Sequence, residues 1–554
     1  MNAELLLAHF NRISAAPDAV ARLRLFVLDL AVRGKLVEQH PDDEWATKLM
    51  NRVAKQSSQK AGTGTAGARA IVFNASDPAP FSIPASWVWV RLGDICSKTG
   101  SGSTPRGGKA VYQNSGIPFL RSQNVHNDGL RLDDVAYISD ETHERMSGTA
   151  VEPNDLLLNI TGGSIGRCCL VPKGFDKANI SQHVAIIRTA ADGVQGYLHQ
   201  LVLSPYFQAF VIGEQTGAGR LGLPKNKMDR IPVALPPLLE QQRIVEKVDE
   251  LMALCDGLEA TQREQEARRD QLTASTHHHL NNGGDADELR NHAQVFIGNL
   301  PRFTTRADQI KQLRQTILNL AVRGKLIPTD PTEALAPRLV KRITLSETAE
   351  EPFTLPSSWL WARVEQVAET RLGKMLDKAK NVGKPQRYLR NINVRWFDFD
   401  LSDLYEMRFR DEELEEFSLR AGDVLICEGG EPGRAAVWDD REQNIYFQKA
   451  IHRVRFPEGV DPHFFLSTLR QSADNGRLSN YFTGVGINHF TGRGLASFSF
   501  PIPPLAEQHR IVAKVDELMA LCDQLEASLT TAQTETSRLL ESVLHHALQD
   551  ASLA

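Results

Sequence analysis

The sequence lacks several features that define whole protein classes. No apolar run approaches the roughly 18–20 residues that cross a membrane, and no signal peptide opens the chain. The six cysteines include no Cys-x-x-Cys pair. A basic excess is missing too, because the net charge is −5, so any contact with nucleic acid has to come from local charge. We therefore expect a cytoplasmic protein with reduced cysteines.

Motifs of catalysis are also missing. The sequence has no Asn/Asp-Pro-Pro-Tyr/Phe of an amino-methyltransferase, no His-Glu-x-x-His, and no carboxylate pair followed by the Glu-x-Lys of a nuclease. The phrase Thr161-Gly-Gly-Ser-Ile-Gly-Arg167 lacks the Gly-Lys-Ser/Thr of a phosphate-binding loop, so we interpret it as a tight turn that can serve as a reading loop. These absences favour a binding protein over an enzyme.

The three histidines at 277–279 do not predict a metal site. His278 and His279 recur 267 residues later as His545 and His546, so they belong to a repeated helix end. Neither cysteine nor carboxylate accompanies them at ligand spacing. We expect no metal in this chain.

The dominant feature is a duplicated amphipathic stretch at residues 235–258 and 502–525, a separation of 267. In each copy Pro-Pro ends a strand and precedes a helix. The apolar residues that follow alternate in steps of four and three, which is the seam of a coiled coil. The two seams are Ile244, Val248, Leu251, Cys255 and Leu258, and Ile511, Val515, Leu518, Cys522 and Leu525. We expect helices of about 35–40 residues, each with the other seam as its natural partner.

Other phrases repeat as well. Leu-Ala-Val-Arg-Gly-Lys-Leu stands at 30–36 and 320–326, and Trp-x-Trp openings end at Trp89 and Trp361. The roughly 150 residues after each opening are rich in β-branched runs and glycine, which predicts a sheet-dominated globule. The predicted order is a helical segment 1–54, a flexible linker 55–80, a globule 81–235, a long helix 236–280, a hinge 281–290, a helical segment 291–350, a globule 351–502 and a long helix 503–550. The predicted fold is α+β, with two α/β globules at opposite ends of an antiparallel coiled coil and a pseudo-two-fold repeat.

Local charge points to nucleic acid. Between Arg371 and Arg395 the chain carries eight Lys and Arg against Asp377 alone, and the first globule has milder basic stretches. Arg and Lys bind phosphates, and interleaved Asn, Gln and Arg match base edges. For either stretch alone, a solvated charged face is the alternative. The candidate DNA-binding residues are Arg106, Lys109, Arg121, Ser122, Gln123, Asn124, Ser164, Arg167, Gln182, Arg220, Lys225, Lys227, Arg371, Lys374, Lys378, Lys380, Lys384, Arg387, Arg390, Asn391, Asn393, Arg434, Gln448, Lys449, Asn488 and Arg493. Among them Arg390 and Asn393 are expected to read bases, and Lys380 to bind phosphate.

Taken together, these motifs resemble the specificity subunit of a Type I restriction-modification system, over essentially the full chain. The resemblance rests on the Pro-Pro-Leu-x-Glu-Gln-x-Arg-Ile phrases ending at Ile244 and Ile511, the heptad helices behind them, the Trp openings and the Leu-Ala-Val-Arg-Gly-Lys-Leu pair. About 80 residues precede the first Trp opening, and the role of this N-terminal extension stays open.

The resemblance implies a non-catalytic reader of double-stranded DNA with two target-recognition domains, one for each half of a split, asymmetric site. It implies helices that set the spacer and dock two methyltransferase subunits, with restriction subunits joining the assembly. It places S-adenosylmethionine, ATP and Mg²⁺ on the partner subunits and no cofactor in this chain. Two alternatives remain: a coiled-coil scaffold that binds only protein, and an enzyme with a centre hidden in a globule.

Overall fold

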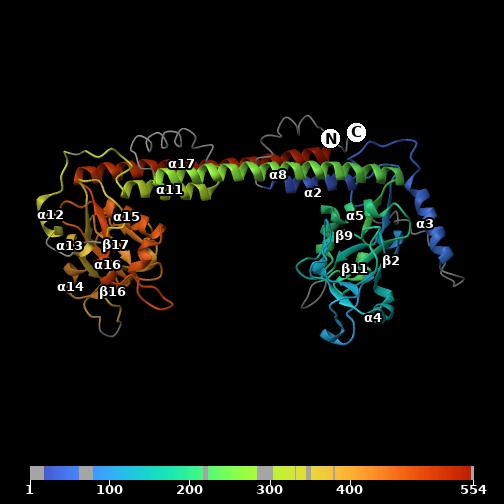
Figure 1. Ribbon diagram of the computed structural model, residues 1–554, viewed down its shortest axis with the longest axis horizontal. Coiled ribbons are helices and arrows are strands. Elements are labelled where there is room, and N and C mark those ends of the chain that lie inside the picture. The colour runs from blue at the N-terminus through green and yellow to red at the C-terminus, as the bar shows by residue number, and fades with distance from the viewer. Residues whose placement is uncertain are drawn as a thin grey trace. The chain divides into compact units, whose positions relative to one another are not determined.

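The computed structural model describes residues 16, 18–60, 79–215, 222–282, 304–330, 332–344, 351–377 and 381–550. These form two compact units, one of Met1–Glu264 with Gln533–Ala554 and the other of Gln265–Ala532. Each unit contains one globular head and part of each of two long helices, α8 (Leu238–Asn282, 45 residues) and α17 (Leu505–Asp550, 46 residues), as Figure 1 shows. Both long helices are longer than the 35–40 residues estimated from the sequence, and they lie close to the predicted ranges 236–280 and 503–550.

The first unit contains helices α2 and α3 and a globular head from β1 to β12, which we call head 1. Its elements are α2 (Ala19–Val32), α3 (Ala46–Lys60), β1 (Val88–Arg91), η1 (Leu92–Ile95), β2 (Cys96–Ser101), η2 (Gly108–Val111), β3 (Ile117–Leu120), η3 (Ser122–Asn124), β4 (Val125–His126), β5 (Gly129–Leu130), β6 (Ala136–Ile138), α4 (Asp140–Arg145), η4 (Ser147–Thr149), β7 (Ala150–Val151), β8 (Leu156–Asn159), β9 (Cys168–Leu170), β10 (Ala178–Ile180), β11 (Val184–Thr189), α5 (Gln195–Leu203), α6 (Pro205–Gly213), α7 (Lys225–Met228) and β12 (Pro232–Leu235).

The second unit repeats this order in a shorter form, and its globular head, from β13 to β21, is head 2. Its elements are α11 (Ala307–Val322), α12 (Pro337–Thr344), β13 (Leu360–Arg363), α13 (Val364–Val367), β14 (Glu369–Leu372), β15 (Lys384–Leu389), η5 (Asn391–Asn393), β16 (Tyr405–Phe409), α14 (Asp411–Glu416), β17 (Val424–Cys427), β18 (Ala435–Val437), β19 (Tyr446–Phe447), β20 (Ile451–Arg455), α15 (Pro462–Asp474), η6 (Arg477–Tyr481), α16 (Gly492–Ser497) and β21 (Ser499–Ile502).

The main sheets of the two heads have matching strand orders. One sheet runs β2-β11-β8-β9 in head 1 and β14-β20-β17-β18 in head 2, with antiparallel neighbours throughout. A second sheet, β6-β3-β10-β7 in head 1 and β16-β15-β19 in head 2, includes one parallel pair in each case, β3 with β10 and β15 with β19. The heads are mixed α+β domains, which confirms the predicted fold class.

A two-stranded antiparallel ribbon closes each head. Strand β1 pairs with β12 in head 1, and β13 pairs with β21 in head 2. Each ribbon joins the Trp-x-Trp opening to the strand that ends at the Pro-Pro, and the long helix starts directly after the prolines. Proline cannot donate to a strand ladder but fits the first turn of a helix, so the position of this boundary was predictable.

A buried tryptophan–glutamate hydrogen bond fixes each head to its long helix. Trp87 Nε1 donates to Glu240 at 3.0 Å, and Trp359 Nε1 donates to Glu507 at 3.0 Å. Both glutamates are almost completely buried, and burial raises the pKa of each carboxyl. The neighbouring glutamine of the repeated phrase, seen at Gln241, donates back to the Pro236 carbonyl at 2.8 Å and closes the first helical turn.

The seam of each long helix packs first against a short helix of its own unit. In the first unit Ile244 and Val248 share a core with Val27 and Val32 of α2 and with head 1. In the second unit the corresponding seam residues, Ile511, Val515 and Cys522, pack with Ile310, Leu313 and Ile317 of α11. The sequence predicted that each seam pairs with the other. That prediction missed α2 and α11, which cover the first half of each seam with apolar faces of their own.

The long helices do meet further along, where they run antiparallel in the first unit. The start of α2 packs against Leu540 and Val543 of α17, and the later residue Leu23 packs with Cys255 and Leu544. Helix α2 therefore lies parallel to α17 and antiparallel to α8. The expected coiled coil is thus a helical bundle to which α2 contributes.

Matched ion pairs hold the short helices in both units. Arg24 of α2 lies 2.6 Å from Asp256 and 2.9 Å from Glu259. Arg314 of α11 lies 2.7 Å from Asp523 and 3.1 Å from Glu526, which are the repeat equivalents of those two acids.

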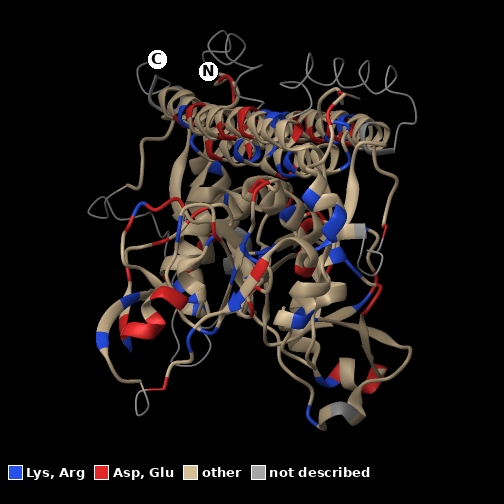
Figure 2. Ribbon diagram, turned by 90° about the vertical axis from the view of Figure 1, so that its left-hand side faces the viewer, with Lys and Arg blue, Asp and Glu red and all other residues tan. Residues whose placement is uncertain are grey.

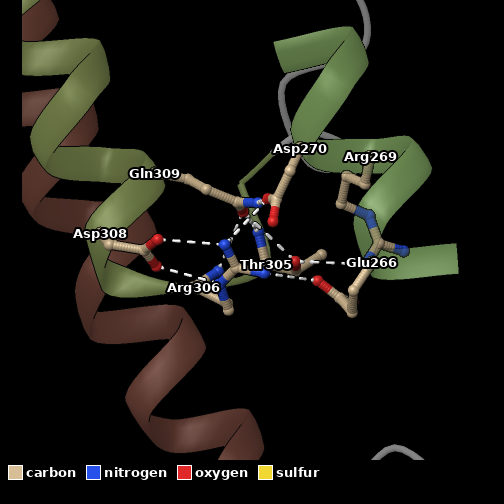
Figure 3. A network of polar contacts seen from close by, with 7 residues as sticks. All are labelled: Glu266, Arg269, Asp270, Thr305, Arg306, Asp308 and Gln309. Carbon is tan, nitrogen blue, oxygen red and sulfur yellow. Dashed lines mark hydrogen bonds and ion pairs between the residues drawn. The ribbon is translucent and has the colours of Figure 1, made fainter. Parts of the chain in front are cut away.

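The start of α11 has an additional network, drawn in Figure 3. Arg306 bonds Glu266 and Asp270 of α8, each at 2.8 Å, and also pairs with Asp308. Gln309 donates to Asp270 at 3.0 Å. This network ties α11 to the second half of α8.

Two predicted boundaries differ from the structure. Helix α3 continues to Lys60, six residues into the predicted linker at 55–80, because its sequence still carries good helix formers. Residues 61–78 lie outside the described residues, as do residues 283–303, which include most of the predicted hinge at 281–290. Helix α8 itself continues through Asn282.

Replacing Glu507 by Gln should make the protein more stable at neutral pH. The pKa of Glu507 is raised above its usual 4.5, so the ionised carboxylate opposes folding. This loss is absent below pH 4.5, where the unfolded state also binds the proton; it grows as pH rises above 4.5 and is complete above the folded pKa. Glu507→Gln keeps the acceptor for Trp359 but cannot ionise. In thermal unfolding, the variant should have a higher melting temperature than wild type at pH 7 but not at pH 4.

Glu535→Gln, an exposed change on the same helix, is the control and should follow wild type at both pH values. Identical pH profiles for wild type and Glu507→Gln would contradict the assignment.

Candidate nucleic-acid interface

Three loop segments lie side by side at one edge of head 1. The Ile160 N–H donates to the His183 carbonyl at 3.0 Å, and the Leu223 N–H donates to the Ile160 carbonyl at 2.9 Å. These bonds bring together residues 160–167, between β8 and β9, residues 181–184, at the start of β11, and residues 222–224, which precede α7. We call these residues the loop face of head 1.

Head 2 contains the same arrangement. The Glu428 N–H donates to the Ala450 carbonyl at 2.9 Å, and the Phe490 N–H donates to the Glu428 carbonyl at 2.8 Å. Residues 428–434, 448–451 and 489–493 form the loop face of head 2. The three positions are the repeat equivalents of Ile160, His183 and Leu223, so the sheet edge that presents the loops is duplicated.

Glycines shape the turn at the centre of each loop face. Gly162 and Gly166 have φ of 81° and 88°, and their equivalents Gly430 and Gly433 have 82° and 89°. Such positive φ values suit glycine because a side chain would clash with the backbone. This confirms the tight turn predicted at 161–167, which links β8 to β9.

The loop face of head 1 includes no carboxylate, and its polar side chains are Thr161, Ser164, Arg167, Ser181, Gln182 and His183. Arg167 and Gln182 are exposed, and Ser164 accepts a hydrogen bond from Asn159 at 3.1 Å. His183 Nδ1 lies 2.6 Å from the Thr161 hydroxyl, a contact that joins two of the three segments.

The loop face of head 2 carries different side chains in the same frame. Lys449 and Arg493 are exposed, and His489 lies against Gly429. Glu431 pairs with Arg434 at 2.9 Å, and Glu428 adds a second acid to this turn. Within the described part of the chain, Arg167, Lys449 and Arg493 form no ion pair with a carboxylate, which leaves them available for phosphates.

The sequence matches a known protein family. A family model, the Type I restriction modification DNA specificity domain, matches residues 84–269 and 361–533, which are the two heads with the first part of each long helix. The chain belongs to this family.

Two curated relatives match nearly the whole chain. It is 25% identical to the Type I restriction enzyme EcoEI specificity subunit of Escherichia coli, covering 96% of this chain and 94% of that protein. It is 26% identical to the EcoAI specificity subunit of the same species, with the same coverage. The crystal structure of the HsdS subunit from Thermoanaerobacter tengcongensis aligns at 18% identity over 85% of this chain and 98% of that one, with a TM-score of 0.44.

As a member of the specificity family, the chain is a DNA-recognition protein of Type I restriction-modification that works with other subunits of such a system. No helix in the described ranges is long and apolar enough to cross a membrane. The same ranges contain no cluster of three or more His, Cys, Asp or Glu that could hold a metal ion.

The basic stretch at 371–395 is not the open positive patch that the specificity subunit was predicted to use. Carboxylates from other segments pair with its cations, as for Arg371 with Glu416 and Arg387 with Glu442, the latter at 2.9 Å. The further pairs are Lys374 with Glu413, Lys384 with Asp411, Arg390 with Asp403 and Arg395 with Asp400. These carboxylates lie outside residues 371–395, so counting charges within that segment did not include them.

The milder basic stretches of head 1 are paired in the same way. Lys225 lies 2.5 Å from Asp229, and Lys227 lies 2.6 Å from Glu214. Arg121 is 4.0 Å from Asp134, to which Gln123 also donates. Figure 2 shows Lys and Arg interspersed with Asp and Glu over the ribbon rather than gathered on one face.

Asn393, predicted to read bases, and Asn124, predicted to bind DNA, form hydrogen bonds within the fold instead. Asn393 is 2% exposed; its amide donates to the carbonyls of Asp400 and Asp403, and its oxygen accepts from the Arg390 N–H. Asn124 is equally buried and makes the matching bonds in head 1. The Arg390 guanidinium is also engaged, lying 3.7 Å above the Tyr405 ring.

The remaining predicted residues fall into three groups. Ser164, Arg167, Gln182, Gln448, Lys449 and Arg493 lie on the loop faces, with Asn488 beside them; Arg106 is exposed next to Gly102, whose N–H donates to the Val184 carbonyl. Ser122 and Asn391 brace the loop faces, since their carbonyls accept from Asn159 and Arg434. Arg220, Lys378, Lys380 and the side chain of Lys109 lie outside the described residues.

The sequence reasoning missed Thr161, His183 and His489. Histidines were considered only as metal ligands, at 277–279. The signal for His183 was available, because it stands directly beside the predicted residue Gln182.

Replacing Asn393 by Ala should destabilise head 2 without changing what it recognises. The variant removes the three hydrogen bonds of a buried amide, so the free energy of unfolding should fall by about 1–3 kcal/mol. Denaturant unfolding measures this loss, and Asn488→Ala, an exposed change in the same head, should stay within about 0.5 kcal/mol of wild type. A fully stable Asn393→Ala protein with altered DNA specificity would restore the original assignment of Asn393 as a base reader.

Proposed function

We propose that this chain sets the DNA sequence specificity of a Type I restriction-modification complex by reading a bipartite, asymmetric site. Each head reads one half-site through its loop face. The long helices set the length of the spacer and dock two methyltransferase subunits. Restriction subunits join that assembly.

One observation supports the proposal above the others: the sheet edge is duplicated, yet its side chains are not. The turn arginine is common to both heads, as Arg167 and Arg434, but the second segment differs. Gln182 and His183 of head 1 correspond to Lys449 and Ala450 of head 2. Sequence is read by side chains on base edges, whereas a shared backbone fixes their position. Two half-sites of different sequence are therefore expected.

The charge pairing described above limits how the chain binds DNA. With a net charge of −5 and most predicted cations neutralised, a small number of exposed Arg and Lys supply phosphate contacts. Affinity in the cell then has to come largely from the partner subunits, and this chain contributes discrimination. The partners would also hold S-adenosylmethionine, ATP and Mg²⁺, none of which we assign to this chain.

Replacing Arg167 by Ala should weaken DNA binding by the assembly of this chain with its methyltransferase subunits. Loss of one phosphate contact reduces affinity by about tenfold and lowers the slope of log K against log salt by about one. Lys173→Ala is the matched control, because Lys173 is an exposed cation at the other end of the β8–β9 hairpin. Binding titrations over a range of salt concentrations measure both effects.

Mapping of methylated adenines in DNA exposed to the wild-type assembly should give a single motif with two unlike halves. Gln182→Ala should relax the motif in one half only, because Gln182 lies on the loop face of head 1. Equal losses for Arg167→Ala and Lys173→Ala, or methylation without a motif, would contradict the proposal and favour a scaffold that binds only protein.

A further inference from the structure

A short hairpin in head 2 projects from the loop face with an apolar tip. Thr483 and His489 exchange two backbone hydrogen bonds, at 2.9 and 2.8 Å, and close the loop between them. We call residues 483–489 the apolar hairpin. Its tip carries Val485, with a relative exposure of 105%, and Ile487, at 71%. Val485 is thus as open as a residue in an extended chain.

The conformation of the hairpin is fixed although its tip is exposed. Gly484 has φ of 118°, and a Cβ atom at this position would lie 2.1 Å from the Ile487 carbonyl oxygen. Glycine is therefore required for the turn. At the base, the Phe482 and Phe490 rings pack with centroids 5.6 Å apart, and Phe490 is fully buried. The tip is held out by a packed base.

The base belongs to the loop face. The Phe490 N–H is one of the bonds that define that face, and His489 lies against Gly429. Residues 475–506 contain no Asp or Glu, and Arg493 follows the hairpin on α16. Glu428 lies at the base, where its carbonyl accepts from the Phe490 N–H, but the hairpin itself carries no acid. An apolar tip followed by a basic residue suits the groove of a nucleic acid, where phosphates flank stacked bases.

Single exposed hydrophobic residues are common and need no explanation. Two aliphatic side chains on one narrow turn, next to a surface assigned to DNA, are a different case. DNA-bending proteins insert Ile, Leu or Met between base pairs in this way and unstack one step.

We infer that Val485 and Ile487 insert into duplex DNA and unstack one base step within the half-site read by head 2. This inference rests on the proposed function, since it assumes that the loop face meets DNA. It adds a contribution to recognition that depends on how easily a base step opens. Pyrimidine–purine steps open most easily, so the insertion would favour one of them.

Head 1 should lack this insertion. Its corresponding sequence, residues 216–222, has Ala218 and Arg220 at the places of Val485 and Ile487. The structure of that segment lies outside the described residues, so this comparison is one of sequence alone. A methyl group and a guanidinium cannot supply the paired aliphatic wedge of head 2.

The experiment uses the complete assembly with its methyltransferase subunits and duplexes that contain its mapped site. The fluorescent base 2-aminopurine replaces one purine at a time in both half-sites, omitting the methylated adenines, because methyltransferases extrude their target base. The double variant Val485→Ala/Ile487→Ala is compared with wild type. Ile212→Ala in α6 is the control, because Ile212 is another exposed aliphatic residue, at 66%.

Binding of wild type and of the control should raise the fluorescence at one step of the half-site read by head 2 and at none in the other half-site. The double variant should lose that rise and bind the site about tenfold more weakly. It should melt at the same temperature as wild type, because neither side chain is packed.

Three results would overturn the inference. One is specific binding and methylation with no fluorescence rise, which leaves the proposed function intact. Another is an equal loss when deoxyuridine replaces a thymine, which indicates a contact to the thymine methyl group instead. A third is unchanged DNA binding with weaker assembly of the methyltransferase subunits, which indicates a protein-docking tip. Absence of any specific binding by wild type would count against the proposed function itself.

Discussion

The structure depends on one buried contact that occurs twice, the hydrogen bond from a tryptophan of the head to a glutamate at the start of a long helix. Trp87 and Glu240 form it in one unit, and Trp359 and Glu507 in the other. A head that reads DNA has to be held at a fixed angle on its helix, because an error at this joint moves every loop beyond it. A buried, directional hydrogen bond beside a Pro-Pro turn supplies that rigidity better than apolar packing alone, which tolerates rotation.

The repeat preserves the joints and changes the surfaces. Arg24 and Arg314 hold equivalent acids, and Arg188 and Arg455 pair with the buried carboxylates Asp155 and Asp423 in equivalent places. Asp155 and Asp423 are buried, so loss of their arginine would leave a buried charge without a partner, whereas the acids that pair with Arg24 and Arg314 are exposed. Loop residues have no buried partner to satisfy, so two copies of one backbone arrangement can have different side chains in their loops. Duplication of a frame with divergent loops is a direct route to two unlike half-sites.

Much of the fold could be predicted because its signals are local. Heptad spacing, Pro-Pro before a helix, and Gly162 with Gly166 in a turn all depend on residues close together in the chain. The partner of each seam could not be predicted this way. The seams are covered by α2 and α11, whose apolar faces resemble many others, and only the folded structure shows which faces meet.

In the candidate site, too, local sequence patterns were predictable and contacts between distant residues were not. Asn393 and Asn124 are of a residue type that reads bases. The side-chain amide N–H groups of each, however, donate within the fold, to carbonyls seven to ten positions further along the chain. The cations of 371–395 meet acids such as Glu416 and Glu442 that stand tens of residues away. A cation next to a carboxylate attracts phosphate weakly, so the number of Lys and Arg in a segment says little about its affinity for DNA. What decides is which cations the fold leaves without an acid, and on the described loop faces Arg167, Lys449 and Arg493 are such cations, all of them exposed.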